Sequence, residues 1–263
     1  MHSFGEQRKL RSLAERVYFQ TFGVADPAHY LHHVYLRRFV DTLDRFQPNR
    51  ILDAGCGSGD HSFWLARRFP GAEVVGVDIN EERVEQNRHK AGQLGIKNVS
   101  FERADLAAAS FNPGFDLIVS IDVLEHIEDR PAALKNLARA LNPGRRAFFH
   151  IPTVRVRPTP LSAHLHGFHE WTAHEHHELP TAESFAEQIR AAGLRVDDLV
   201  LTFGRMTGEL ATSLFVLPYK NTPINRLAQL LVSLPCHVLA RLDRIRQKTR
   251  YAVAASCTRL TLH

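Results

Sequence analysis

The sequence predicts an α/β fold in which a doubly wound, mostly parallel sheet carries helices on both faces. Strand and helix patterns alternate from Ile51 to Phe203, which is the first observation behind this prediction. The segment 115–121 is apolar, as in a strand buried on both faces, and a glycine-rich turn separates the first strand from the next helix. With 263 residues, 44% of them hydrophobic, the chain is long enough for one large domain with appendages.

The elements are expected in a regular order. Helical spacing over 5–22 and 28–46 predicts two N-terminal helices, the second ended by Pro48 and Asn49, so that 1–48 forms a helical extension of the main domain at 49–263. Strands are predicted at 51–54, 72–79, 99–103, 115–121, 146–151, 194–203 and 251–258. Helices are predicted to start near His61 and to cover 81–94, 131–141 and 182–192, with Gly95 as a C-cap and Asn142-Pro143-Gly144 as a stop.

Two segments interrupt this rhythm. Residues 152–180 hold six histidines without a clear period, and Phe168 and Trp171 add apolar bodies, so we expect a lid over the substrate. Metal binding there is disfavoured, because the histidines lack HExxH spacing. Residues 205–250 form two helical patterns around Pro235 and are expected as an insertion before the last strand.

The charge and the cysteines bound the class of protein. The formal net charge is +5, yet from Lys220 onward there are eight lysines and arginines and one acid, so the basic character belongs to the tail. The three cysteines do not form a CxxC pair, which indicates reduced thiols, and the first residues lack the pattern of a secretory signal. A cytoplasmic protein is expected, with peripheral membrane contact as an option for the tail.

The apolar stripe at 223–250 is too short and interrupted to span a bilayer. Beside its arginines and lysines it could lie in a membrane interface, or it could pack on the core or form a homodimer face. The tail lacks interleaved aromatic residues apart from Tyr251, which disfavours nucleic acid as a partner.

The glycine-rich turn, Asp53-Ala54-Gly55-Cys56-Gly57-Ser58-Gly59, has the features of a ligand-binding loop. Its glycines permit positive φ and close approach of a ligand to the backbone. Their spacing is GxGxG, and Asp60 occupies the place of the third glycine in the dinucleotide fingerprint, where a carboxylate would repel a pyrophosphate. A Lys-Ser/Thr pair is also missing, which excludes a Walker loop. Asp78 ends the second strand, where a carboxylate can accept hydrogen bonds from two ribose hydroxyls.

Five segments in order resemble the motifs of the class I S-adenosylmethionine-dependent methyltransferases. They are ILDAGCGSGD, VVGVDIN, ERADL, FDLIVSIDVLEHIED and LNPG, spread over residues 50–152. The resemblance implies a Rossmann-like sheet of seven strands with the last antiparallel. It also implies S-adenosyl-L-methionine as cofactor and methyl transfer as the reaction.

The resemblance also implies roles for individual residues. Asp53, Gly55, Gly57, Gly59 and Asp122 would line the methionine part of the cofactor. Asp78 would hold the ribose, Ile79 would pack against the adenine, and Asp105 and Leu106 would meet the adenine edge. The residues themselves leave plainer alternatives open, since Asp53 and Asp122 could cap loops and Asp105 could cap a helix.

The substrate side is less defined. Histidines near the carboxyl ends of the strands are candidates for a general base, namely His126, His150 and the lid histidines, His174 among them. His126 could instead cap a helix or shape the pocket. No NPPY-type segment follows the fourth strand. We therefore expect a small-molecule or glycan- or lipid-linked acceptor, methylated at oxygen. A non-catalytic cofactor-binding scaffold and an RNA-directed methyltransferase are the alternatives.

Overall fold

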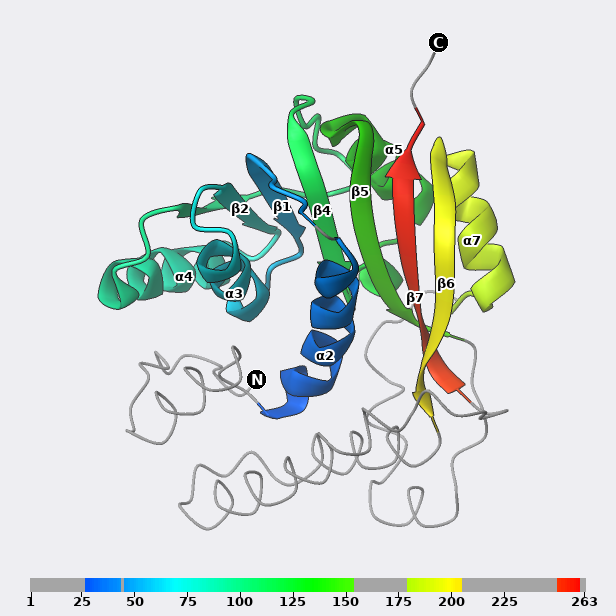
Figure 1. Cartoon of the computed structure of the whole chain (residues 1–263), viewed down its shortest axis with the longest axis horizontal. Helices are drawn as coiled ribbons and strands as arrows, with labels where there is room; N and C mark the ends of the chain where they lie inside the picture. Colours follow the sequence, from blue (N-terminus) through cyan, green and yellow to red (C-terminus); the bar gives the residue numbers. More distant parts are fainter. Residues whose placement is uncertain (1–26, 44, 154–178, 205–249, 261–263) are drawn as a thin grey trace.

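The computed structural model describes residues 27–43, 45–153, 179–204 and 250–260. These residues form a seven-stranded sheet in the order β3-β2-β1-β4-β5-β7-β6, as Figure 1 shows. The strands are β1 (Arg50–Ala54), β2 (Glu73–Asp78), β3 (Val99–Arg103), β4 (Phe115–Ile121), β5 (Leu141–Pro152), β6 (Leu194–Gly204) and β7 (Arg250–Arg259). Neighbours among β1 to β5 run parallel, and β7 runs antiparallel to both β5 and β6. The predicted sheet, with its antiparallel last strand, is confirmed.

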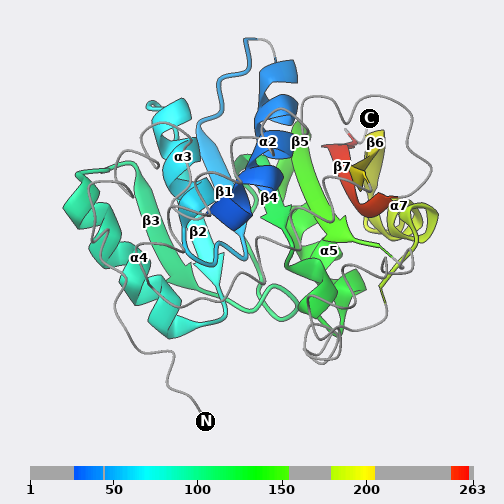
Figure 2. The same cartoon turned by 90° about the horizontal axis from the view of Figure 1, so that it is seen from below.

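Helices cover both faces of the sheet (Figures 1 and 2). They are α2 (Pro27–Thr42), α3 (Asp60–Arg68), α4 (Glu81–Leu94), the single-turn η1 (Leu124–His126), α5 (Arg130–Ala140) and α7 (Ala182–Ala191). Side chains of α2 and α3, such as Leu36 and Leu65, are buried with Ile51 and Leu117 on one face. On the other face, α5 and α7 are buried with inward residues of the central strands. Each fully buried Leu or Phe contributes about 1.5–3 kcal/mol, so these two layers fix the sheet.

Local capping explains why α4 has the predicted bounds. Asn80 accepts a hydrogen bond from the backbone N–H of Arg83 at the N-terminus, and Gly95 ends the helix with φ of 65°. Asp129 and Thr181 cap α5 and α7 in the same way. Short polar side chains before these helices therefore set their starts.

Two predicted boundaries were wrong. The helix predicted at 28–46 ends at Thr42, whose hydroxyl donates to the carbonyl of Phe39 at 2.6 Å, and Arg45 then turns the chain with a positive φ of 55°. The fifth strand begins at Leu141, although Asn142-Pro143-Gly144 predicts a turn. A shift of register between Phe115 and Leu117 accommodates these residues within the ladder.

Several predictions lie outside the described residues. These are the helix at 5–22, nearly all of the proposed lid at 152–180 with Trp171 and His174, and the insertion at 205–249. Within the described ranges, no helix is long and apolar enough to cross a membrane. Cys56 and Cys257 are buried free thiols.

One buried histidine, His33, is expected to make the stability of the fold depend on pH. His33 of α2 is fully buried, packed edge-on against Trp64 at 4.7 Å between ring centroids and stacked on His61. Neither of its ring nitrogens has a hydrogen-bond partner in the described part of the chain. Burial, with the positive charges of His61 and Arg37, lowers the pKa of His33 from 6.5 to about 2.

This predicts a pH-dependent stability that His33→Phe removes. A pKa depressed by folding contributes stability above 6.5, and that contribution is lost as the pH falls toward 2. Between pH 6 and pH 4, the free energy of unfolding of the wild type should fall relative to that of His33→Phe by up to about 1.4 kcal/mol per pH unit. Urea unfolding at several pH values measures this, and His89→Gln, an exposed histidine on α4, is the control. Parallel pH curves for wild type and His33→Phe would contradict the assignment.

Candidate functional site

The glycine-rich loop between β1 and α3 is fastened to the end of β2. The backbone N–H groups of Gly55 and Cys56 both donate to the carbonyl of Val77, each at 2.8 Å. Gly55, Gly57 and Gly59 have φ of 81°, 51° and 80°, which is the left-handed region. The loop therefore has a fixed shape that depends on glycine.

Added side chains would meet different surroundings at the three glycines. A Cβ on Gly55 would lie 2.3 Å from Val123, and one on Gly59 would lie 2.9 Å from Phe63. A Cβ on Gly57 would meet nothing within 4 Å. Gly55 and Gly59 are thus required by packing, whereas Gly57 exposes backbone to open space where a ligand can approach closely.

Asp78 ends β2 beside this open space. Its carboxylate accepts hydrogen bonds from the backbone N–H of Gly57 at 2.8 Å and of Asn80 at 2.9 Å. The side chain is buried and each of its two oxygens holds a backbone N–H, so Asp78 fixes the loop against the end of β2. On the other side of the loop, Asn87 of α4 donates to the carbonyl of Gly57 and Lys90 donates to that of Ser58. Asn87 and Lys90 were not predicted as site residues, because they lie one helical turn apart on α4 and no local sequence pattern marks a contact with the loop.

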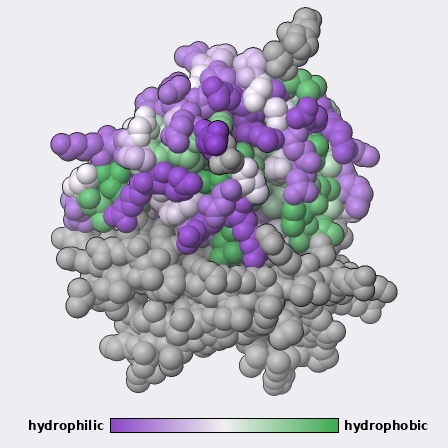
Figure 3. All heavy atoms as spheres, viewed as in Figure 1, coloured by the Kyte–Doolittle hydropathy of each residue, from purple (hydrophilic) through white to green (hydrophobic). Residues whose placement is uncertain are grey.

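The residues predicted to meet an adenine lie next to Asp78 along the same edge. Ile79 is 61% exposed, although the described surface is mostly hydrophilic in the view of Figure 3. The backbone N–H of Ala104 donates to the carbonyl of Asp78, which brings the Asp105-Leu106 turn alongside. Asp105 is exposed and accepts from the backbone N–H of Ala107, which stabilises a turn and not the helix that it could have capped, while Leu106 is buried. Ile79 is therefore an exposed apolar side chain next to Asp78.

Asp53 lies at the buried end of β1. The hydroxyl of Ser62 donates to its carboxylate at 2.5 Å. Burial raises the pKa of Asp53 to about 6, and the Ser62 hydrogen bond offsets only part of that effect. A cationic ligand group nearby would favour the ionised form.

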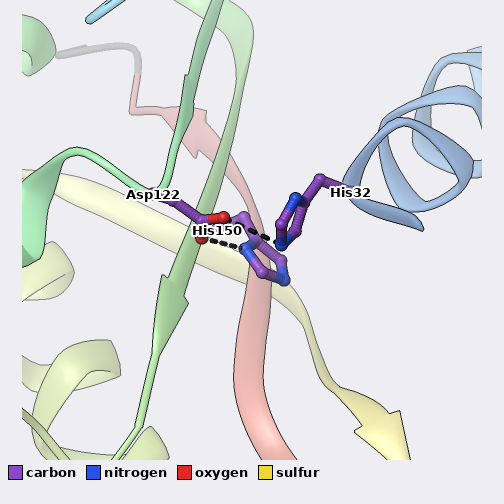
Figure 4. A group of neighbouring side chains, drawn as sticks. All are labelled: His32, Asp122 and His150. Carbon is purple, nitrogen blue, oxygen red and sulfur yellow. Dashed lines mark hydrogen bonds and ion pairs between the residues drawn. The ribbon is translucent and has the colours of Figure 1, made fainter. Parts of the chain in front are cut away.

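A second polar cluster lies where β4 and β5 end beneath α2 (Figure 4). Asp122, with a positive φ of 52°, follows β4 and lies between two imidazoles. The Nε2 atom of His32 lies 2.9 Å from its Oδ2, and the Nδ1 atom of His150 lies 2.7 Å from its Oδ1. The other ring nitrogen of His150 lies 2.9 Å from the hydroxyl of Thr202. Residues of α2 and β5 thus meet at the carboxylate that follows β4, and β6 supports His150 from behind.

The electrostatics of this cluster favour an ionised carboxylate. Burial alone would raise the pKa of Asp122, but the two imidazoles hold it well below its usual range. Glu125 behaves in the opposite way, because burial and the negative charge of Asp122 raise its pKa well above the usual range. The pKa values of these two neighbouring carboxyl groups are therefore shifted in opposite directions.

The histidines predicted as candidates for a general base differ in their exposure and in their contacts. His126, on η1, has a side chain that is 49% exposed. His150 is 1% exposed and both of its ring nitrogens have partners, so it is a buried anchor instead of a group open to an acceptor. His174 lies outside the described residues. His32 was not among the candidates, since a histidine in a helix pattern has no mark of function.

Comparison with known proteins identifies the family. A family model described as a methyltransferase domain matches residues 28–199. Ubiquinone biosynthesis O-methyltransferase of Idiomarina loihiensis is 29% identical over 232 residues, which cover 84% of this chain and 89% of that protein. Trans-aconitate 2-methyltransferase of Pseudomonas paraeruginosa is 36% identical over 135 residues, covering 49% of this chain and 47% of that protein.

Solved structures share the fold. Phosphoethanolamine N-methyltransferase 2 of Haemonchus contortus, in complex with S-adenosyl-L-methionine, superposes with a TM-score of 0.66 at 18% identity, covering 97% of this chain and 59% of that one. A putative sarcosine dimethylglycine methyltransferase from Galdieria sulphuraria gives 0.61 at 14% identity, covering 95% and 99%. The chain therefore belongs to the methyltransferase domain family, and it is an S-adenosylmethionine-dependent methyltransferase.

Proposed function

We propose that this enzyme transfers a methyl group to an oxygen atom of a small-molecule acceptor. One observation carries the choice of oxygen, namely that the O-methyltransferase of Idiomarina loihiensis matches over most of both chains. A relative named for methylation at nitrogen, phosphoethanolamine N-methyltransferase 3 of Arabidopsis thaliana, matches over 60% of this chain and 31% of its own length. The full-length likeness therefore favours a hydroxyl acceptor.

We propose that the cradle around Gly57 holds the cofactor. Gly57 would let its methionine part approach the loop backbone, with Asp53 and Asp122 on the same side. Asp78 would hold the ribose, with Ile79, Asp105 and Leu106 around the adenine. When bound, S-adenosylmethionine supplies an electrophilic methyl group on a sulfonium, so the protein must orient the acceptor and control its proton.

His126 is proposed as the group that receives the acceptor's proton. Its half-exposed ring follows the carboxyl end of β4, the edge at which open α/β sheets bind ligands. Imidazole has a pKa near neutrality and can take up a proton there. The Nε2 atom of His126 lies 3.8 Å from Oε1 of the buried Glu125, whose pKa is raised by burial and by the charge of Asp122.

The lid around Trp171 and His174 and the apolar stripe at 223–250 remain proposals, since nearly all of their residues lie outside the described part of the chain. If the stripe binds an anionic membrane surface, a lipid-linked acceptor becomes accessible; if it packs between two chains, it supports a homodimer. A cofactor-binding scaffold would bind the cofactor without turnover on any acceptor, and an RNA-directed enzyme would label RNA in a salt-sensitive manner.

Gly57→Val should abolish cofactor binding. The valine would fill the open space above the loop, and its φ of 51° would cost about 1–2 kcal/mol for a residue with a Cβ. Titration calorimetry with the cofactor's demethylated product measures the affinity. Gly92→Val is the matched control, because Gly92 lies in α4 with nothing within 4 Å of an added Cβ and without a positive φ. Normal binding by Gly57→Val would show that the loop is only a turn.

Cofactor affinity should depend on the ionisation of Asp53. Its pKa of about 6 in the free protein means that the carboxyl must lose a proton before it can pair with the cofactor's cationic groups. Affinity is therefore expected to be constant above about pH 7 and to fall by up to about tenfold per pH unit below pH 6. Asp53→Asn should bind more weakly at pH 8 and lose this dependence. An unchanged pH dependence in Asp53→Asn would assign it to another group.

The acceptor class can be tested with paired substrates. Aromatic compounds that bear a hydroxyl should accept a labelled methyl group, whereas the same skeletons with an amine should not. The assay follows label from the cofactor into the product by mass spectrometry, with and without anionic vesicles that carry a lipid-linked phenol. Preference for the amine members would overturn methylation at oxygen.

His126→Gln should lower kcat by about 10²–10⁴, as expected when a general base is removed. Cofactor affinity should remain within about twofold, because the side chain is not part of the cradle. Steady-state kinetics and calorimetry together measure both effects. A kcat close to that of the wild type would reduce His126 to a helix-end residue.

A further inference from the structure

The cluster of His32, Asp122 and His150 brings together three side chains of the kinds that bind metal ions. One ligand-type atom from each residue can be chosen so that all three lie within 4.8 Å of one another. The residues come from α2, from the end of β4 and from β5, and Figure 4 shows their polar ends turned toward one another. Two imidazoles and one carboxylate are the donors that zinc and ferrous ions accept in proteins.

We propose that His32, Asp122 and His150 form a binding site for one divalent transition-metal ion of the zinc or ferrous type. His32 would bind through Nε2 and His150 through Nδ1, the two atoms that now lie 2.9 Å and 2.7 Å from the carboxylate oxygens of Asp122. Shifts of a few tenths of an ångström would open these contacts to the separations found between ligands of one ion.

The surroundings of His150 match those of a metal ligand. A ligating histidine usually donates its other ring N–H to a second residue, which fixes the ring and its tautomer. The Nε2 atom of His150 lies 2.9 Å from the hydroxyl of Thr202, and both residues are about 1% exposed. A threonine hydroxyl can donate or accept, so it serves His150 in the metal-free tautomer and in the metal-bound one.

The metal-free arrangement is consistent with this proposal. Without an ion, a neutral imidazole protonated at the contacting nitrogen can donate to Asp122 from each side, and the two N–H groups would satisfy the carboxylate. When a metal replaces those two contacts, the proton on each ring moves to its other nitrogen, and no acid or base needs to leave the site. Backbone geometry supports the same position, because the N–H of Asp122 donates to the carbonyl of His150 at 3.1 Å.

Exposure indicates which side of the ion would remain open. The side chain of Asp122 is 30% exposed and that of His32 is 11% exposed, whereas that of His150 is 1% exposed. Three protein ligands leave at least one position of a tetrahedral ion for water or substrate, the pattern of catalytic rather than structural zinc. A zinc-bound water has a pKa near 7 instead of 15.7.

A hydroxyl acceptor bound in the open position would lose its proton more readily for the same reason. This role rests on the proposed methyl transfer to oxygen, but the metal site itself does not. The two can therefore fail separately, since metal binding is measured without cofactor or acceptor.

Cobalt titration tests the site directly. The full chain is stripped with a chelator and titrated with Co²⁺, whose visible absorption reports nitrogen and oxygen ligation, and Zn²⁺ is then added as competitor. We expect about one ion per chain at this site, displaced by Zn²⁺. His32→Gln should lose that absorption, and Thr202→Val should weaken affinity by about 10–100-fold. His89→Gln, an exposed histidine elsewhere, should bind as the wild type does.

Three results would overturn the proposal. The first is the absence of visible absorption at saturating Co²⁺ in a folded wild-type chain. The second is equal affinity in wild type, His32→Gln and Thr202→Val, with circular dichroism confirming that both variants fold. The third is absorption that persists in His32→Gln and disappears in His174→Gln, which would place the ion on the histidines at 164–177.

Discussion

The carbonyl of Val77 accepts two backbone hydrogen bonds, from Gly55 and Cys56, and the candidate cofactor site depends on them. They fasten the loop after β1 to the end of β2, so the open backbone at Gly57 lies directly beside Asp78. Without that attachment the loop and the carboxylate would be independent features of two strands. With it, they form one surface at the carboxyl edge of the sheet, where open α/β folds bind their ligands.

The helix α4 reinforces the same surface from behind. Asn87 and Lys90 hold the carbonyls of Gly57 and Ser58, while Asp78 holds the N–H of Gly57. The loop is therefore ordered by the protein before a ligand arrives. Binding then has less conformational entropy to overcome, and more of the contact energy appears as affinity.

The helix α2 imposes a second constraint. Its apolar side chains are buried with those of α3 and the central strands, and this packing places His32 against Asp122 at the ends of β4 and β5. The loop and the histidine cluster thus occupy the same edge of the sheet but depend on different helices. A change in α2 should therefore disturb the histidine cluster before it disturbs the glycine loop.

Local sequence signals explain which parts could be predicted. The helix at 81–94 was confirmed to the residue because Asn80 and Gly95 mark both ends, and the strand at 115–121 was confirmed because its apolar run cannot be a surface segment. The start of β5 was missed because Asn142-Pro143-Gly144 reads as a turn, and only pairing with β4 shows how the ladder absorbs it.

The same distinction between local and long-range contacts explains which site residues could be predicted. The glycine loop and Asp78 could be found from spacing, because their contacts lie within one β-loop-α-β unit. The partnership of Asp122 with His32, His150 and Thr202 could not, since it joins residues up to 170 positions apart and depends on the packing of α2 over the sheet. Spacing also did not reveal that His150 is buried while His126 is exposed.

The most direct measurement of the central claim is a crystal structure of this chain with the demethylated cofactor, S-adenosylhomocysteine. We expect the ligand to lie over Gly57, with its ribose hydroxyls on the carboxylate of Asp78 and its adenine against Ile79. A ligand bound elsewhere on the sheet, or bound at this edge without contact to Asp78 and the loop, would contradict it.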